Sequence, residues 1–147
     1  MPHPPSAPFE VLEHSGDLSI VARGTGFLEA LAHASSGLVS QIVDLEQIAE
    51  REEIPVRVEG DDDAERAIAF LNEILYLVYT RGWVPRRVKT LSQCTRKDCR
   101  EIAGVVVGEA LDPARHELKY DVKAVTYHGF QITTRRGLTE IRFLCDL

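Results

Sequence analysis

The sequence predicts an α+β fold in which two helices pack on mostly antiparallel β-sheet, and two observations support that prediction. The first is helical periodicity, because apolar residues recur every three or four positions over residues 27–42 and again over residues 64–78. The second is the remainder of the chain, which is rich in short runs of alternating apolar and polar residues. Two helices combined with several such runs are typical of an α+β sandwich.

The first predicted helix follows two short β-like runs within residues 9–23. Thr25 precedes this helix and is its expected N-cap, because a hydroxyl can accept a hydrogen bond from a free backbone N–H of the first turn. Gly37 lies inside the apolar pattern, where glycine costs about 1 kcal/mol. We therefore expect another element to pack closely at Gly37.

The second predicted helix is the clearest element of the chain. Asp62 and Glu65 have the spacing of an acidic capping pair, and Gly82 follows the helix as a C-terminal glycine commonly does. Capping also explains the run of three aspartates at residues 61–63, which lacks the glycine and distal glutamate of a calcium-binding loop. We therefore interpret this run as structural.

The predicted strands surround the second helix. Pro55 argues that its strand starts or borders a sheet, and Arg135-Arg136-Gly137 indicates a hairpin turn. The predicted strands cover residues 52–59, 88–92, 102–110, 120–127, 131–134 and 140–146.

Length and composition indicate one globular domain at residues 9–147, preceded by a flexible lead-in at residues 1–8. The net charge of −6 does not favour a protein that grips nucleic acid by itself, and no apolar window is long enough for a membrane span. The proline-containing lead-in is not expected to act as a signal peptide. Three cysteines, an odd number, predict ordinary reduced thiols and a cytoplasmic protein.

The turn before residue 18 permits two interpretations. It carries His14 and Asp17, and it is either a polar turn whose aspartate bonds its own backbone or a site where Asp17 binds a metal. The last predicted strand ends on Asp146 and Leu147, which add a side-chain and a main-chain carboxylate. Three such oxygen groups suit a hard cation such as Ca²⁺ or Mg²⁺. The alternative is that Asp146 is only a solvated end residue.

Other polar residues offer weaker candidates. Lys123, Tyr127 and His128 are possible acid–base or partner-facing groups near one predicted strand, although an isolated histidine is more often structural. Residues 111–118 form a predicted exposed loop that could bind a partner or an anion, although such charged loops are more often simply solvated. The chain contains no phosphate loop or dinucleotide fingerprint, and no nucleophile with an assigned base.

In their order along the chain, these pieces resemble the archease family over about nine-tenths of the sequence. The segments that carry the resemblance are residues 9–17 (FEVLEHSGD), 43–46 (VDLE), 71–77 (LNEILYL), 108–112 (GEALD), 116–119 (HELK), 123–129 (KAVTYHG) and the final Asp-Leu. The family turn is usually His-Thr-Ala-Asp, whereas this chain has His14-Ser15-Gly16-Asp17. The stretch 92–100, with two cysteines, looks peculiar to this chain.

The resemblance implies an accessory protein rather than an enzyme. Archeases assist the GTP-dependent RtcB-type RNA ligase of tRNA splicing by promoting its guanylylation and repeated turnover, so contact with RNA would be indirect. The metal site of the family falls on Asp17, Asp146 and Leu147, and Ca²⁺ is the associated ion. His14, Lys123, Tyr127 and His128 would support this site or face the partner.

Two other functions are compatible with these residues. One is a stand-alone metal-dependent hydrolase or nucleotidyl-transfer enzyme, with His14 or His128 as general base. The other is a chaperone-like binding module that needs no metal.

Overall fold

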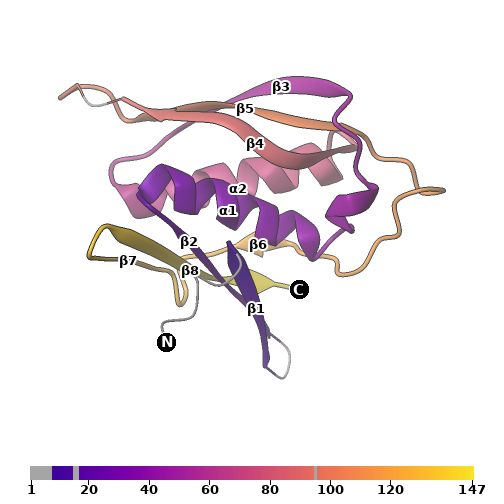
Figure 1. The fold of residues 1–147 in the computed structure, drawn as a ribbon, viewed down its shortest axis with the longest axis horizontal. Helices are drawn as coiled ribbons and strands as arrows, with labels where there is room; N and C mark the ends of the chain where they lie inside the picture. Colours follow the sequence, from indigo (N-terminus) through magenta and orange to yellow (C-terminus); the bar gives the residue numbers. More distant parts are fainter. Residues whose placement is uncertain (1–7, 15–16, 95) are drawn as a thin grey trace.

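The structure is a computed structural model that describes residues 8–14, 17–94 and 96–147, and it has three layers (Figure 1). Helices α1 (Phe27–Ser40) and α2 (Asp63–Tyr79) form the middle layer between two antiparallel sheets. The predicted α+β class, with two helices packed on antiparallel sheet, is confirmed. None of the described helices is long and apolar enough to cross a membrane.

The larger sheet has five strands in the order β1-β2-β8-β6, and β7 pairs with β8 beside β6. Its central strands β2 and β8 turn their apolar faces, with Ile20 and Phe143, toward the helices. The strands are β1 (Phe9–His14), β2 (Asp17–Gly24), β6 (Ala124–Val125), β7 (Gln131–Arg135) and β8 (Leu138–Asp146).

The smaller sheet has three strands in the order β3-β5-β4 and covers the other side of the helices. Pro55 lies on the edge strand of this sheet, as predicted, where its missing N–H costs no ladder bond on the open side. A short 3₁₀ helix, η1, lies between α1 and this sheet in the sequence. The elements are η1 (Leu45–Gln47), β3 (Glu52–Glu59), β4 (Trp83–Gln93) and β5 (Glu101–Ala110).

Local packing confirms one expectation for α1 and contradicts another. A Cβ added to Gly37 would lie 3.0 Å from Ile20 Cγ2 and 3.1 Å from Phe9 Cγ, so the predicted close approach is present. The N-cap, however, is Gly26 and not Thr25. The Thr25 hydroxyl donates instead to the Glu29 carboxylate, at 3.0 Å.

The cap of α2 is confirmed, because the Asp62 side chain accepts a hydrogen bond of 2.8 Å from the Glu65 N–H. The other two aspartates of the run at 61–63 pair with Arg100 at 2.7 Å and with Arg66 at 2.8 Å. The interpretation of this run as structural agrees with these contacts.

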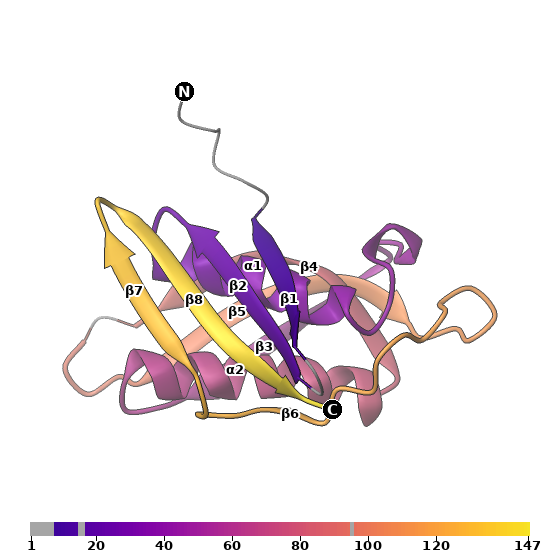
Figure 2. The same ribbon diagram turned by 90° about the horizontal axis from the view of Figure 1, so that it is seen from below.

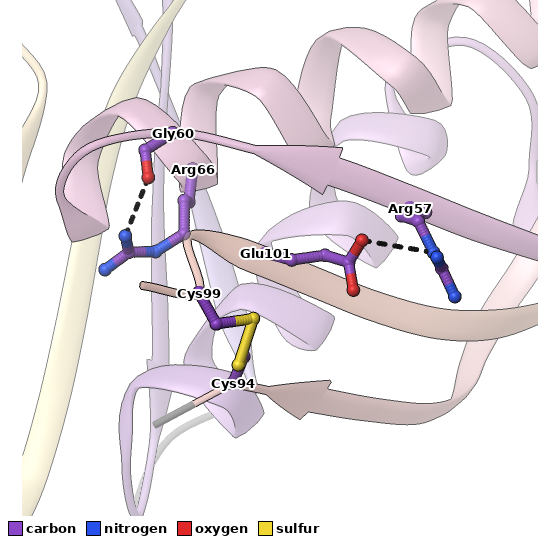
Figure 3. Close-up of a disulfide and its surroundings, with 6 residues drawn as sticks. All are labelled: Arg57, Gly60, Arg66, Cys94, Cys99 and Glu101. Atoms are coloured by element: carbon purple, nitrogen blue, oxygen red, sulfur yellow. Dashed lines mark hydrogen bonds and ion pairs between the residues drawn. A yellow bond between two sulfur atoms is a disulfide. The ribbon is translucent and has the colours of Figure 1, made fainter. Parts of the chain in front are cut away.

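The β4–β5 hairpin corrects the expectation for two of the cysteines, because Cys94 and Cys99 form a disulfide (Figure 3). Their Cα atoms are 5.6 Å apart, within the usual range for a disulfide. The hairpin creates this approach, so the pairing depends on strand register and not on spacing in the sequence. Cys145 is a free, buried thiol as expected, and burial raises its pKa to about 12.

Candidate functional site

The candidate metal site lies at one end of the larger sheet, where β2 begins and β8 ends (Figure 2). Leu18 is the register partner of Cys145, so the ladder continued by one residue sets Asp17 opposite Asp146. Opposed residues in such ladders have Cα atoms about 4.5–5.5 Å apart. Leu18 and Cys145 are buried, whereas Asp17 and Asp146 are exposed, as alternation across a strand requires.

The donors at this corner suit a hard cation. Within the described ranges, neither Asp17 nor Asp146 has an ion-pair partner. Directly opposed carboxylates repel, and a bound cation would offset that repulsion. The described residues contain no group of three His, Cys, Asp or Glu side chains that could hold a metal ion. The third predicted donor is not a side chain but the main-chain carboxylate of Leu147. The residues therefore fit a hard cation in the type of their donors.

Strand β6 flanks Asp146 on the side away from β2. Ala124 is the register partner of Asp146, and the Lys123 N–H donates to the Asp146 carbonyl at 2.7 Å. The structure therefore brings Lys123, an exposed residue, to the candidate site. The predicted strand at 120–127 is wrong in extent, because only Ala124–Val125 forms a ladder.

Tyr127 and His128 are not brought to this corner. The chain leaves β6 in the direction opposite to β8, and partial desolvation, with the carboxylates of Glu65 and Asp62, raises the pKa of Tyr127. Those carboxylates belong to the start of α2, whereas the candidate site lies near its other end. His14 is the register partner of Asp17, but its side chain and turn residues 15 and 16 lie outside the described residues.

The segment 111–123 reaches the corner by way of the end of α1. Backbone N–H groups of Lys119 and Tyr120 donate to the carbonyls of Ile42 and Gln41, at 2.9 and 3.0 Å. The Lys119 Nζ donates to the Ser40 carbonyl at 3.2 Å. The last turn of α1 has no basic residue of its own, so Lys119 supplies the positive charge that favours a helix C-terminus.

Two tyrosines fix the final residues before β6. The Tyr79 hydroxyl accepts a hydrogen bond of 2.9 Å from the Val122 N–H, and burial raises the pKa of Tyr79. The Tyr120 hydroxyl donates to Glu13 Oε1 at 2.7 Å, and this bond raises the pKa of Tyr120. Both hydroxyls therefore stay protonated at neutral pH and hold the segment against α2 and β1.

The side chain of Asn72 in α2 makes the hydrogen bonds to β6 that a second neighbouring strand would otherwise make. Its amide nitrogen donates to the Val125 carbonyl at 2.9 Å, and its amide oxygen accepts from the Val125 N–H at 3.0 Å. A single side chain thus satisfies both backbone groups of Val125. This contact sets the position of the strand that pairs with Asp146.

The other end of the segment is anchored by a buried carboxylate that was not among the predicted site residues. Glu109 is 3% exposed and bonds the Ala49 N–H at 2.6 Å, Arg51 at 3.1 Å, and also Arg115. Arg115 is the largest of several influences that lower the pKa of Glu109 to about 2. The sequence indicates such a buried charge only by its position, because Glu109 comes two residues after the apolar run Val105–Val107 in the same predicted strand.

His116 completes this cluster and corrects the expectation of a merely exposed loop, because it is 1% exposed. Its Nδ1 accepts a hydrogen bond of 2.8 Å from the Asp112 N–H, which can only donate. The ring proton therefore lies on Nε2, which donates to Glu109 Oε2 at 3.0 Å. Glu109 and His116 together fix where the segment leaves β5.

Comparison with known proteins places this geometry in a family. The model of the Archease protein family (MTH1598/TM1083) matches residues 9–147. The protein archease of Pyrococcus furiosus is 36% identical over 125 residues, covering 84% of this chain and 87% of that protein. The protein archease of Methanopyrus kandleri is 28% identical over 140 residues, covering 95% of this chain and 99% of that protein.

Two solved structures share the fold. The solution structure of Methanobacterium thermoautotrophicum protein 1598 matches with a TM-score of 0.81 and 25% identity, covering 95% of this chain and 99% of that chain. The crystal structure from Thermotoga maritima described as an archease and possible chaperone (TM1083) matches with a TM-score of 0.62 and 20% identity, covering 92% and 94%. From the family model and the curated relatives together, the chain belongs to the archease family.

Proposed function

We propose that this chain is an accessory protein that activates a GTP-dependent RtcB-type RNA ligase in tRNA splicing. It promotes guanylylation of the ligase and allows multiple turnover, and it is not itself an enzyme. Its contact with RNA in this role runs through the ligase. The proposal rests on membership of the archease family over residues 9–147.

The proposal includes a divalent cation, for which we take Ca²⁺, held by Asp17, Asp146 and the carboxylate of Leu147. The observation that carries this part is the opposed pair of exposed carboxylates where β2 begins and β8 ends. Oxygen donors of this kind are those that Ca²⁺ prefers. A cation bound there would supply positive charge beside the ligase.

The protein groups around the donors hold the corner in shape. Lys123 binds the Asp146 carbonyl through its backbone, while Tyr79 and Tyr120 fix the segment that leads to Lys123. These contacts restrain the residues next to the donors before a partner arrives. Such restraint lowers the entropy cost of binding.

The experiment is reconstitution of ligase guanylylation and RNA joining with the variants Asp17→Ala and Asp146→Ala. We expect both variants to lose most of the stimulation of turnover and to bind Ca²⁺ more weakly in calorimetry. Glu117→Ala is the matched control, because Glu117 is an exposed carboxylate that is not part of the ladder between β2 and β8. Undiminished guanylylation and turnover with both aspartate variants would refute the metal role.

A chaperone-like binding module is the second candidate, and the description of the Thermotoga maritima archease as a possible chaperone favours it. Removal of the metal by a chelator distinguishes the two functions. A binding module keeps its partner binding and its stimulation of the ligase after EDTA treatment, whereas the proposed activator loses the stimulation.

A further inference from the structure

The β7–β8 hairpin carries a cavity of about 570 Å³. The turn of this hairpin lies at the end of β8 away from the C-terminus (Figure 2). Leu138, at the start of β8, and Asp146 are eight residues apart in the same strand, which corresponds to roughly 26 Å. The cavity is therefore separate from the candidate metal site. Its lining residues are Thr133, Arg135, Arg136, Leu138 and Glu140.

Four of the five lining residues share one face of the hairpin, and the fifth, Arg136, lies in its turn. Thr133 is the register partner of Glu140, and Arg135 is the register partner of Leu138. The side chains of register partners in an antiparallel ladder project to the same side of the sheet, so these four side chains lie together on one face. The opposite side carries Ile141 and Thr139, which are buried toward the helices.

The charges on this face favour an anion. Arg135 and Arg136 are exposed, and neither has an ion-pair partner within the described parts of the chain. The one carboxylate of the lining, Glu140, is bound by Arg23 at 3.2 Å. The two adjacent guanidinium groups are therefore the free charges of the cavity.

The backbone at Arg136 gives an independent indication. Arg136 and Gly137 have φ values of 54° and 80°, so they form the two central residues of a tight hairpin turn with left-handed conformation. Asparagine, aspartate and glycine adopt this conformation with less strain than arginine. Backbone strain of this kind is concentrated at functional sites, so a strained residue with a free charge beside a cavity indicates a binding role for its side chain.

We infer that the β7–β8 hairpin is a binding site for a phosphate group of a nucleotide or of a nucleic-acid backbone. Arg135 and Arg136 hold the phosphate oxygens by charge-assisted hydrogen bonds, and the Thr133 hydroxyl adds a donor. The exposed side chain of Leu138 offers an apolar surface for a ribose or a base. This site is additional to the proposed activation of the ligase and does not depend on the metal.

The test follows backbone amide shifts by NMR while inorganic phosphate, GTP or a short single-stranded RNA is added to the full chain. We expect phosphate to shift amides within residues 133–140, and either GTP or RNA to bind more tightly than phosphate alone. A response to GTP identifies a free nucleotide as the source, and a response to RNA identifies a nucleic-acid backbone. Salt should weaken RNA binding strongly.

Two variants separate binding from folding. Arg136→Asn should weaken binding about tenfold by removing a charge-assisted bond, yet it should raise Tm by about 2 °C because asparagine tolerates the turn better. Arg135→Gln should weaken binding similarly. Arg142→Gln is the matched control, because Arg142 is an exposed arginine of β8 that does not line the cavity.

The inference fails if none of the three ligands shifts the hairpin amides. It fails also if Arg142→Gln weakens binding as much as the two hairpin variants, since general charge attraction would then explain the result. Asp17→Ala should leave this binding unchanged, so the outcome is independent of the test of ligase activation.

Discussion

Glu109 is the residue whose environment departs most from that of an ordinary surface carboxylate. Its two oxygens receive hydrogen bonds from Arg51, Arg115, His116 and the Ala49 backbone, so burial is compensated on every side. A buried charge with its partners in place is tolerated, whereas removing one member of the group exposes the others to a large penalty. Glu109 therefore holds the segment that leads to the candidate metal site by electrostatics rather than by apolar packing.

Because of this environment, the stability of the folded protein falls as the pH becomes acidic. Folding lowers the pKa of Glu109 from 4.5 to about 2, so the folded state binds fewer protons than the unfolded state between these values. The stabilisation is complete above about pH 4.5 and disappears as pH falls toward 2. We expect Glu109→Gln to cost about 3 kcal/mol at neutral pH and to flatten the loss of stability between these two pH values. Urea unfolding measured across this range checks the prediction.

Glu117→Gln is the control for that experiment, because Glu117 is exposed and makes no hydrogen bond or ion pair within the described residues. It should leave the pH profile unchanged. Parallel profiles for the wild type and Glu109→Gln would show that Glu109 does not carry the acid dependence.

Among the described elements, β6 is a short strand in which a helix side chain takes the place of one neighbouring strand. It has two residues, Ala124 and Val125, and it pairs with β8 on one side and with the Asn72 amide on the other. An apolar strand of normal length would stay in place by burying several side chains. A two-residue strand cannot, so the helix supplies the missing ladder bonds.

We expect Asn72→Ala to leave the N–H and the carbonyl of Val125 without partners, at a cost of about 2 kcal/mol. Hydrogen exchange at the Val125 amide should accelerate far more than exchange in β2. Asn72→Asp keeps an acceptor for the Val125 N–H, so it should preserve more protection than alanine. Equal protection of Val125 in the wild type and in Asn72→Ala would contradict the role of this contact.

At the scale of the whole molecule, the larger sheet brings together two segments that are far apart in the sequence, the start of β2 and the end of β8. The candidate site needs Asp17 from the second strand and Asp146 from the last, and the pairing of β2 with β8 joins them (Figure 2). A ligand that binds both residues binds the folded state alone, because the unfolded chain keeps them apart. Binding should therefore stabilise the whole fold and not merely one corner of it.

We predict that Ca²⁺ raises Tm. At a concentration about 100 times Kd, binding contributes about 2.7 kcal/mol, which corresponds to roughly 8 °C for a domain of this size. EDTA should reverse the increase, and Asp17→Ala and Asp146→Ala should each abolish most of it. Calorimetric scans of the three proteins with and without Ca²⁺ provide the measurement. An equal increase in both variants would place any bound cation elsewhere.

The sequence by itself determined the features that depend on neighbours along the chain. Helical spacing gave both helices, the Asp62 cap needed only the N–H of Glu65, and Pro55 could border a sheet but not join two strands. The turn at Arg136-Gly137 was likewise readable from its residues. The kinds of donor at the candidate site were also predictable, because a carboxylate offers hard oxygen donors whatever its place in the fold.

Only the tertiary structure decided which distant residues meet. The opposition of Asp17 to Asp146, the burial of His116 against Glu109 and the shortness of β6 all follow from strand register and from packing between layers. The disulfide between Cys94 and Cys99 depends in the same way on a hairpin register. A sequence pattern records the period of an element but not its partner, and partners are chosen by the burial of many side chains at once.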